Sequence, residues 1–414
     1  MEKSFSSHPA PPADPAHPAS SIPVVLAGFT AFLSLYAPQP LLPLFQRIFG
    51  ATHFAVSLTV TATTIGVAIA APFVGRLADA WGKRRVIVLS AFVLAATTLL
   101  AASATTLWQV VGWRFAQGLV TPGVFAVTVA YIHDQWDSAH AGSVTAAYVT
   151  GTVVGGFSGR VVTGLVAASV GWRASFAATG ALSLVCATLL MLRLPADRAD
   201  PPHRDASGDL RTGALAAHLT SKALLGTYAA GFCVLFTQIA TFTYVTFHLA
   251  GPPFGLSTAA LGWLFVVYLA GAVAAPIAGR WVDVYGHRLA LAAAMAVGAS
   301  GSLLTLGHTI TTVILGLALV CSGVFAAQAA ANGYIGIAAD RDRGLAVGLY
   351  ATFYYIGGSV GGSMPALVWN LGGWPACVAL VVFVQLLTAA LGWQFWGPTR
   401  SRRQSENLAG SFGG

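Results

Sequence analysis

Twelve long apolar runs, separated by short polar stretches, decide which folds are open to this chain. A helix needs about 20 apolar residues to cross the hydrocarbon core of a bilayer, where it must satisfy its own backbone hydrogen bonds. The sequence therefore predicts an all-α membrane protein with twelve transmembrane helices. The runs lie near residues 22–44, 54–75, 86–104, 107–132, 141–168, 172–192, 222–250, 256–279, 288–307, 309–338, 344–370 and 374–397.

The composition supports this prediction and excludes a soluble enzyme. Only 8% of the 414 residues are charged, whereas 56% are hydrophobic. An average soluble domain carries about a quarter charged residues. The lipid bilayer is therefore an expected partner. We expect neither a metal nor another cofactor, because the four cysteines lie far apart in apolar runs and no pair has metal or redox spacing.

Basic residues are distributed unevenly between the two sides of the predicted bundle. If the N-terminus is cytoplasmic, the outer loops keep only Arg47 and Arg173 of the 21 basic residues, and Arg114 and Arg160 lie inside predicted spans. Such a bias predicts that both termini are cytoplasmic. The net charge of +8 is then an orientation signal, and no nucleic-acid partner is expected.

The two halves of the chain repeat each other. Residues 75–83, GRLADAWGK, recur as GRWVDVYGH at 279–287, and Gly171-Trp172 recurs as Gly373-Trp374. Parallel repeats of this kind are a transporter architecture, with the binding site between the halves. We therefore predict two pseudo-symmetric six-helix bundles at 21–194 and 221–397, a cytoplasmic linker at 195–220, a disordered N-terminal tail at 1–20 and a cytoplasmic tail at 398–414.

These motifs resemble those of the major facilitator superfamily, and within it the twelve-helix drug and metabolite exporters of the proton-antiporter group. The resemblance covers essentially all of residues 21–397. It implies a monomeric transporter of a small molecule in the bacterial inner membrane, driven by the proton gradient. The family pattern G-x-L-A-D-R-x-G-R/K-K/R is matched by Gly75, Leu77, Ala78, Asp79, Gly82, Lys83 and Arg84, with Ala80 in the place of Arg, and R-x-x-Q-G is matched by Arg114, Gln117 and Gly118.

The loop that carries the first of these patterns is predicted to act as a gate. Its glycines permit a tight turn, and the charge of Asp79 is favoured near a helix N-terminus. The resemblance implies that the loop latches the outward-open state against the eleventh helix; the alternative is a plain turn with an orientation signal. A second copy, with His287 in the place of the first basic residue, is expected to be weaker; it consists of Gly279, Asp283, Gly286 and Arg288.

The fifth span departs from the pattern of the family. Exporters of this group carry G-P-x-x-G-G there, whereas residues 155–160 of this chain read GGFSGR. The proline is absent and Arg160 stands in the place of a glycine. This departure weakens the transfer of proton antiport from the family to this chain, but it does not affect the predicted fold. Glycines spaced four apart, Gly151, Gly155 and Gly159 on this span and Gly357 and Gly361 on the eleventh, are predicted to let helices pack closely.

Arg114 and Arg160 are the ionisable residues of greatest interest. A charge at membrane depth costs at least about 2.5–3.5 kcal/mol and is a functional hypothesis by default. Both lie near the outer ends of successive spans and could share one site. All 13 acidic residues fall in loops, tails or helix ends, so neither guanidinium has a carboxylate partner in the middle of the membrane. We expect Arg160 to contact an anionic ligand; for Arg114, with Gln117, structural or coupling roles and ligand contact are equally open.

Polar residues at helical spacing predict a substrate pathway, with hydrogen bonding between helices as the alternative. His248 is the first candidate for proton coupling because of the pKa range of histidine; Asp134 and Asp79 are alternatives, and an interfacial position for His248 is equally open. The polar stripes are Thr237, Thr241, Tyr244 and His248 on the seventh span, Cys321, Phe325, Gln328 and Asn332 on the tenth, and Tyr36, Pro38, Gln39 and Pro40 on the first.

Three functions follow as hypotheses. The first is proton-coupled efflux of a small organic compound, a drug or a metabolite, by alternating access. The second is import or exchange of an organic anion that the intramembrane arginines recognise. The third, a polytopic receptor or membrane enzyme, requires for catalysis an intramembrane nucleophile–base pair or metal cluster that the sequence does not offer, so we expect no enzymatic activity.

Overall fold

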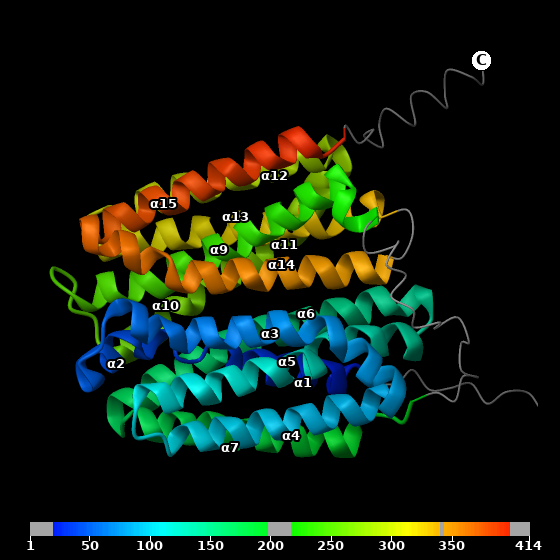
Figure 1. Cartoon of the computed structure of the whole chain (residues 1–414), viewed down its shortest axis with the longest axis horizontal. Helices are drawn as coiled ribbons and strands as arrows, with labels where there is room; N and C mark the ends of the chain where they lie inside the picture. Colours follow the sequence, from blue (N-terminus) through cyan, green and yellow to red (C-terminus); the bar gives the residue numbers. More distant parts are fainter. Residues whose placement is uncertain (1–19, 198–216, 340–342, 398–414) are drawn as a thin grey trace, which may run out of the picture.

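The computed structural model describes residues 20–197, 217–339 and 343–397, and all of its regular elements are helices (Figure 1). The predicted tails, apart from residue 20, and residues 198–216 of the predicted linker lie outside the described residues.

The first half contains six spans, the first of which is broken. Its helix α1 ends at Leu35, and the prolines at 38 and 40 lack the N–H that a continuing helix requires. Gln39 is therefore held in a short 3-10 turn inside the bundle. The elements are α1 (Ile22–Leu35), η1 (Gln39–Leu41), α2 (Leu42–Phe49), α3 (His53–Trp81), α4 (Lys83–Ala102), α5 (Leu107–Gln135), α6 (Ser138–Ser169) and α7 (Trp172–Arg193).

The second half has the same number of spans, two of them interrupted. The helix α15 is kinked at Gly372 and Gly373, so its first turns continue α14 and residues 374–395 form the last span. The elements are α9 (Lys222–Ala250), α10 (Thr258–Leu264), η2 (Phe265–Val267), α11 (Tyr268–Tyr285), α12 (His287–Leu304), α13 (Ile310–Ala338), α14 (Arg343–Ser363) and α15 (Pro365–Phe395).

The helices confirm the predicted fold class. Eleven segments of the described chain are long and apolar enough to cross a membrane. The remaining one, α14, has 21 residues, which corresponds to about 31 Å of helix. It runs beside the others in Figure 1, and its tyrosines, serines and glycines lower its hydropathy. The chain is therefore an all-helical membrane protein with two six-helix halves.

The repeat seen in the sequence recurs in the backbone. Gly82 and Gly286, at matching places in the two copies of the loop motif, have φ of 91° and 81°. Gly171 and Gly373 precede the last span of each half, with φ of 109° and 60°. Side chains rarely tolerate these values, so glycine is required at all four turns. Packing repeats as well: α1 lies against α6, and α9 lies against α14.

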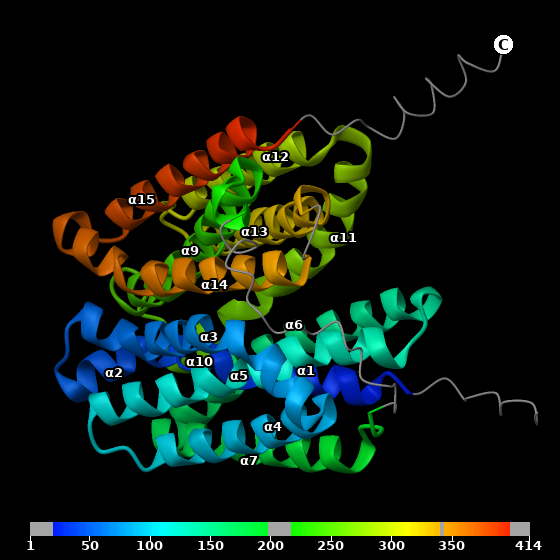
Figure 2. The ribbon, with the colours of Figure 1, turned by 45° about the vertical axis from the view of Figure 1, so that its right-hand side comes forward.

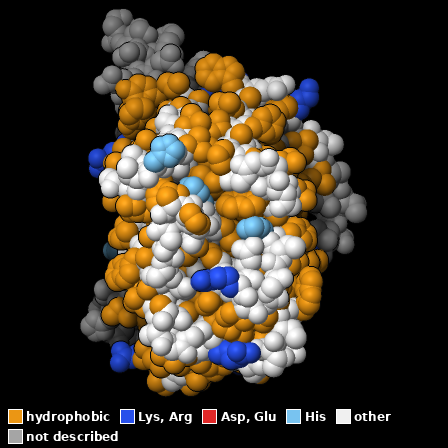
Figure 3. Space-filling view, turned by 90° about the vertical axis from the view of Figure 1, so that its left-hand side faces the viewer, with side chains coloured by type: hydrophobic (Ala, Val, Ile, Leu, Met, Phe, Trp, Pro, Cys, Tyr) orange, Lys and Arg blue, Asp and Glu red, His pale blue; other side chains and the backbone are white. Residues whose placement is uncertain are grey.

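The bundle has two distinct ends. We call the end where α7 stops and α9 begins the linker end, and the opposite one the far end. The far end shows basic and histidine side chains among apolar and neutral ones, without an acidic side chain on that face (Figure 3). Every acidic residue that the structure describes is exposed and lies at the linker end: Asp79, Asp134, Asp137, Asp197 and Asp283.

The two halves meet toward the far end. In Figure 2 the linker-end parts of α6 and α11 lie apart from each other. The hydrogen bonds and ring contacts that described residues make across the halves lie at the far end or midway along the helices. The pairs are His53 with Phe247 and Trp369, Gln39 with Thr243, Thr61 and Thr64 with Ser359, Phe157 with Trp263, Arg160 with Phe265 and Tyr268, and Phe125 with Tyr355.

Candidate functional site

Arg114 lies in α5 and is fully buried. Its Nε donates a hydrogen bond to the carbonyl oxygen of Thr59 (3.0 Å), and its Nη1 donates to that of Ser34 (2.7 Å). The remaining partners are the carbonyl oxygen of Leu35 and Oε1 of Gln117. All of these groups belong to the first half. Arg114 therefore joins α1, α3 and α5, and most of its partners are backbone atoms.

Arg160 lies in α6 and is only 1% exposed. Its Nε donates to Oε1 of Gln39 (2.7 Å), and its Nη1 donates to the carbonyl oxygen of Gly156 (2.6 Å). Its Nη2 makes a long hydrogen bond of 3.5 Å to the hydroxyl of Tyr268 in the second half. Gln39 in turn donates to Thr243 of α9 (3.4 Å). The surroundings of Arg160 thus belong to both halves.

Aromatic rings cover the faces of the Arg160 guanidinium. Its Cζ lies 4.9 Å from the ring centroid of Tyr36 and 4.6 Å from those of Phe265 and Tyr268. A cation over an aromatic face is favourable, and more so where water is excluded. We call Arg160, Gln39, Tyr36, Phe265 and Tyr268 the Arg160 cage. Because Nη2 makes only the long bond to Tyr268, we expect a further acceptor to bind in the plane of the guanidinium, at the Nη2 edge.

The two arginines have different hydrogen-bond partners. Tyr36 lies between them, within electrostatic reach of both guanidinium groups. Arg114 bonds the two residues just before Tyr36, whereas Arg160 lies over its ring. The backbone N–H of Tyr36 donates to the carbonyl oxygen of Ser34, so a partner of Arg114 is bonded directly to a residue of the Arg160 cage.

A group of tyrosines on α14 adjoins the cage, and the sequence analysis missed it. Rings of Tyr350 and Tyr354 stack with centroids 5.8 Å apart, and those of Tyr354 and Tyr355 meet edge to face at 5.4 Å. Tyr354 is within electrostatic reach of Tyr36 and Tyr268. We call Tyr350, Tyr354 and Tyr355 the tyrosine cluster. Its signal in the sequence was the segment YATFYY at 350–355, inside a span whose hydropathy is low.

In the predicted stripe on α9, Thr237, Thr241 and Tyr244 are buried and His248 is half-buried, and the four side chains do not form one group. The hydroxyls of Thr237 and Thr241 have no hydrogen-bond partner among the described residues. Tyr244 donates to the carbonyl oxygen of Gly362 (3.0 Å). His248 packs at the far end against Trp374, with ring centroids 5.5 Å apart, and has no contact with the Arg160 cage in the described part of the chain.

The predicted stripe on α13 runs from the cage toward the linker end, and its exposure rises along the way. Cys321 is buried within electrostatic reach of Arg160. Phe325 and Gln328 are half-buried, and Gln328 accepts a hydrogen bond of 3.0 Å from the hydroxyl of Tyr354. Asn332 is exposed. This face of α13 therefore leads from the linker end to the Arg160 cage.

The predicted packing glycines lie where backbones approach closely. A Cβ atom on any of them would collide with a backbone carbonyl of the neighbouring helix, so each half has its own tight helix pair. Gly151, Gly155 and Gly159 of α6 face Val25, Phe29 and Leu33 of α1, and Gly357 and Gly361 of α14 face Phe232 and Phe236 of α9.

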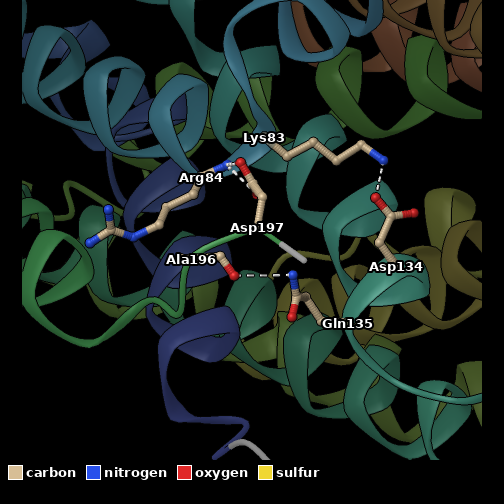
Figure 4. A network of polar contacts seen from close by, with 6 residues as sticks. All are labelled: Lys83, Arg84, Asp134, Gln135, Ala196 and Asp197. Carbon is tan, nitrogen blue, oxygen red and sulfur yellow. Dashed lines mark hydrogen bonds and ion pairs between the residues drawn. The ribbon is translucent and has the colours of Figure 1, made fainter. Parts of the chain in front are cut away.

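The first copy of the loop motif, which begins at Gly75, is held by contacts within its own half (Figure 4). Lys83 forms an ion pair with Asp134 of α5. The carboxylate of Asp197 accepts hydrogen bonds from the backbone N–H of Arg84 (3.0 and 3.3 Å), just after the turn at Gly82. It thereby caps α4, which begins at Lys83 and has no cap of its own.

Asp79 is not part of this network. Its side chain is exposed and has no hydrogen bond or ion pair to another described residue. In this conformation α3 meets α14 through Thr61 and Thr64, toward the far end, and not through Asp79. The predicted latch of the opposite state therefore stays a prediction.

The second copy of the motif, which begins at Gly279, is built from aromatic contacts. After the turn at Gly286, His287 is buried beside Tyr334 and Trp396, with ring centroids 5.6 and 6.4 Å away. Arg288 lies 5.8 Å from the ring of Trp393. Asp283 is exposed.

A groove of about 260 Å³ between α11, α12 and α13 is lined by no residue of the Arg160 cage or of the tyrosine cluster. It offers no charged group to a polar substrate, and several of its side chains are exposed as expected for a surface that faces lipid. Its lining residues are Ala274, Ile277, Ala278, Trp281, Ala290, Ala293, Ala294, Val297, Ser322, Gly323 and Ala326.

Comparisons with known proteins agree with this architecture. The family model described as Major Facilitator Superfamily matches residues 24–257 and 249–412. The uncharacterized MFS-type transporter YybF of Bacillus subtilis (strain 168) is 30% identical over 361 residues, which cover 87% of this chain and 89% of the relative. The inner membrane transport protein YnfM of Escherichia coli (strain K12) is 30% identical over 368 residues, 87% of each chain.

Solved structures share the fold at low sequence identity. A bacterial homologue of the human lysosomal transporter Spinster, in an inward-facing and unoccupied conformation, has a TM-score of 0.73 at 14% identity, over 92% of this chain and 98% of that one. The nucleoside transporter NupG has a TM-score of 0.72 at 15% identity, over 91% of this chain and 100% of that one.

Proposed function

The chain belongs to the major facilitator superfamily and is a membrane transporter, and from this premise we propose that its substrate is a small organic anion bound at Arg160. The observation that carries the proposal is the position of this one charge. Arg160 is buried between the halves, has contacts with both, and has no carboxylate partner within the described residues. An anion that binds the Nη2 edge would supply the missing charge.

The arrangement of the halves supports alternating access as the mechanism. We place the linker end in the cytoplasm because the basic residues are concentrated there. The contacts between the halves toward the far end then correspond to an inward-facing state, which is also the conformation of the Spinster homologue. The rocking of one half against the other would break the bond between Arg160 and Tyr268 and expose Arg160 to the far side.

Export driven by the proton gradient is the direction that we propose, on the likeness of the loop motif and of R-x-x-Q-G to exporters. One observation indicates a group for coupling. His53 is half-buried at the far end, where its ring lies 4.7 Å from that of Phe247 and 5.0 Å from that of Trp369, both in the other half. A proton on His53 would strengthen these contacts through cation–π attraction.

The test is dissipation of a proton gradient in everted vesicles that contain the protein. The probes are benzoate and citrate as anions, glucose as a neutral compound and tetraphenylphosphonium as a cation. We expect an anion to dissipate the gradient and Arg160→Gln to abolish the effect, because a lost charge-assisted hydrogen bond of about 1.5–3 kcal/mol lowers affinity roughly 10- to 150-fold.

Arg173→Gln is the matched control. Arg173 also donates to a backbone carbonyl, that of Ala104 (3.0 Å), and lies 4.4 Å from an aromatic ring, but at the far end and outside the cage. Vesicles with this variant should behave as the wild type. Dissipation by the cation alone, unchanged in Arg160→Gln, would contradict the anion proposal.

A further inference from the structure

The surroundings of the Arg160 cage also indicate the kind of anion, an inference that rests on the proposed function. We infer that the site selects aromatic monocarboxylates, with the carboxylate at the Nη2 edge of Arg160 and the ring of the substrate against the tyrosine cluster. Three observations carry the inference: the single charge, the aromatic surroundings and the scarcity of free polar groups.

The charge requirement is for one negative group. Among the described residues, Arg160 is the only cation in the cage; its Nε donates to Gln39, and one N–H of its Nη1 donates to the carbonyl oxygen of Gly156. The long bond from Nη2 to Tyr268 is the contact that an incoming carboxylate can replace. Arg114 offers no second site, because its donors are bound to backbone carbonyls and Gln117. A dicarboxylate would therefore leave one charge unpaired in a desolvated site.

Aromatic rings extend from the cage toward the linker end on both halves. Tyr268 meets Phe325 edge to face at 6.1 Å, and Tyr355 lies 5.8 Å from Phe125 across the halves. Tyr354 lies beside both groups, since its hydroxyl donates to Gln328, one turn along α13 from Phe325, and its ring packs against Tyr355. Aromatic pairs in these geometries gain energy beyond simple burial. A planar ring is thus the shape that these surfaces accommodate best.

Polar groups that could recognise a sugar or another polyhydroxylated compound are few. Both oxygen and nitrogen of the Gln39 amide are occupied, by Arg160 and Thr243. Oε1 of Gln328 accepts from Tyr354. The hydroxyl of Tyr350 is buried without a hydrogen-bond partner among the described residues, so a polar substituent on the ring could supply one.

The route to the site follows from exposure. The stripe on α13 passes from exposed Asn332 through half-buried Gln328 and Phe325 to buried Cys321 beside Arg160. Gln328 is bonded to Tyr354, so this route passes the tyrosine cluster. A substrate that enters from the linker end therefore meets aromatic rings before it reaches the charge.

The experiment is isothermal titration of the purified full-length protein with benzoate, cyclohexanecarboxylate and benzamide. The three probes have nearly the same size. Cyclohexanecarboxylate lacks the aromatic ring of benzoate, and benzamide lacks its charge. We expect benzoate to bind about tenfold more tightly than cyclohexanecarboxylate, and benzamide to bind more weakly than either. Tyr354→Leu should remove the preference between the two acids, whereas Tyr354→Phe, which keeps the ring and loses the bond to Gln328, should retain it.

Two further variants control for folding. Phe353→Leu alters the same helix outside the cluster, where Phe353 stacks on Tyr228 at 5.5 Å, and it should leave the preference unchanged. Tyr350→Leu replaces Tyr354→Leu if the latter does not fold. Equal affinity for the two acids, still dependent on Arg160, would overturn the aromatic inference and leave the anion proposal standing. Binding of benzamide without benzoate would overturn both, and binding of no probe would overturn the aromatic inference.

Discussion

Arg114 and Arg160 form a natural comparison within one half of the molecule. Both are buried, both belong to the first half, and neither has a carboxylate partner among the described residues. Arg114 is bound by backbone carbonyls of α1 and α3 and by its neighbour on α5, all in the same rigid half. Arg160 is bound by one backbone carbonyl of its own helix, that of Gly156, and otherwise by side chains and rings from both halves.

The difference shows what separates a structural charge from a site. The partners of Arg114 all belong to one half, so we expect its bonds to persist when the halves move against each other. The contacts of Arg160 with Phe265 and Tyr268 change whenever the halves rearrange. Burial and the lack of a countercharge are the same for both; the mobility of the partners decides which arginine is available to a ligand.

The buried arginine of α6 has no counterpart in the second half of the repeat. By the offset of 202 that relates Gly159 to Gly361, Arg160 corresponds to Gly362. A Cβ on Gly362 would meet the side chain of Thr61 of α3, so the second half uses this position for contact with the first. One copy of the repeat thus carries the charge, and the other allows close contact between the halves.

The largest expected effect is that of Arg114→Ala. Its loss leaves several buried carbonyls without a donor, each at about 1–3 kcal/mol, so we expect the free energy of unfolding to fall by about 3–5 kcal/mol. Thermal unfolding followed by tryptophan fluorescence in detergent measures this change. Arg114→Lys keeps the charge but has fewer hydrogen-bond donors, so its free energy of unfolding should lie between those of the wild type and Arg114→Ala. A melting temperature of Arg114→Ala close to that of the wild type would break the comparison.

Arg160→Lys should separate binding from stability. The ammonium keeps the charge but loses the planar donor edge, so we expect benzoate affinity to fall by about 2 kcal/mol, roughly 30-fold, with little change in melting temperature. Titration calorimetry and the same unfolding assay give both quantities on one sample. A variant that melts as early as Arg114→Ala would show that Arg160, too, is a structural residue.

Gly262→Leu tests the contact between the halves beside Arg160. A Cβ at this glycine lies 2.9 Å from the carbonyl oxygen of Arg160 and 3.1 Å from Cα of Gly164. Overpacking there costs about 1–3 kcal/mol and should open the far end. Spin labels at Ser103 and His308, one on each half at that end, should move apart in pulsed dipolar spectra. An unchanged distance distribution would mean that α6 and α10 do not close the far end.

The smallest effects are expected at the linker end. There Asp197, which caps α4, and Asp79, the predicted latch, again contrast a structural charge with a functional one. Asp197→Asn weakens the cap of α4 and should lower the free energy of unfolding by about 1 kcal/mol, without a change in transport rate. Asp79→Asn should leave unfolding and equilibrium binding unchanged but slow transport. Initial rates in vesicles and titrations of the purified variants measure both; a normal rate for Asp79→Asn would remove the predicted latch.

Much of the architecture follows from local features of the sequence. Apolar length predicts the spans, and glycines at turns with positive φ, such as Gly82 and Gly286, mark matching helix ends in the two halves. Polar residues at helical spacing on α13 also share the face that the pattern predicts, because the helix period alone sets it. These features depend on neighbouring residues along the chain, so the amino-acid sequence was sufficient to predict them.

The site depends on relations between helices, and only the tertiary structure decided it. His248 has the right side chain for proton coupling but ends up at the far end against Trp374, whereas His53, which carried no signal, lies between the halves. The tyrosine cluster of α14 belongs to the candidate site only because the fold brings it near Tyr268 on α11 and Tyr36 after α1. The sequence by itself determined twelve spans, their repeat and the lack of a mid-membrane carboxylate, because these are properties of composition and period. Which arginine faces fixed carbonyls and which faces a moving half was decided by the depth and rotation of packed helices, which no local pattern encodes.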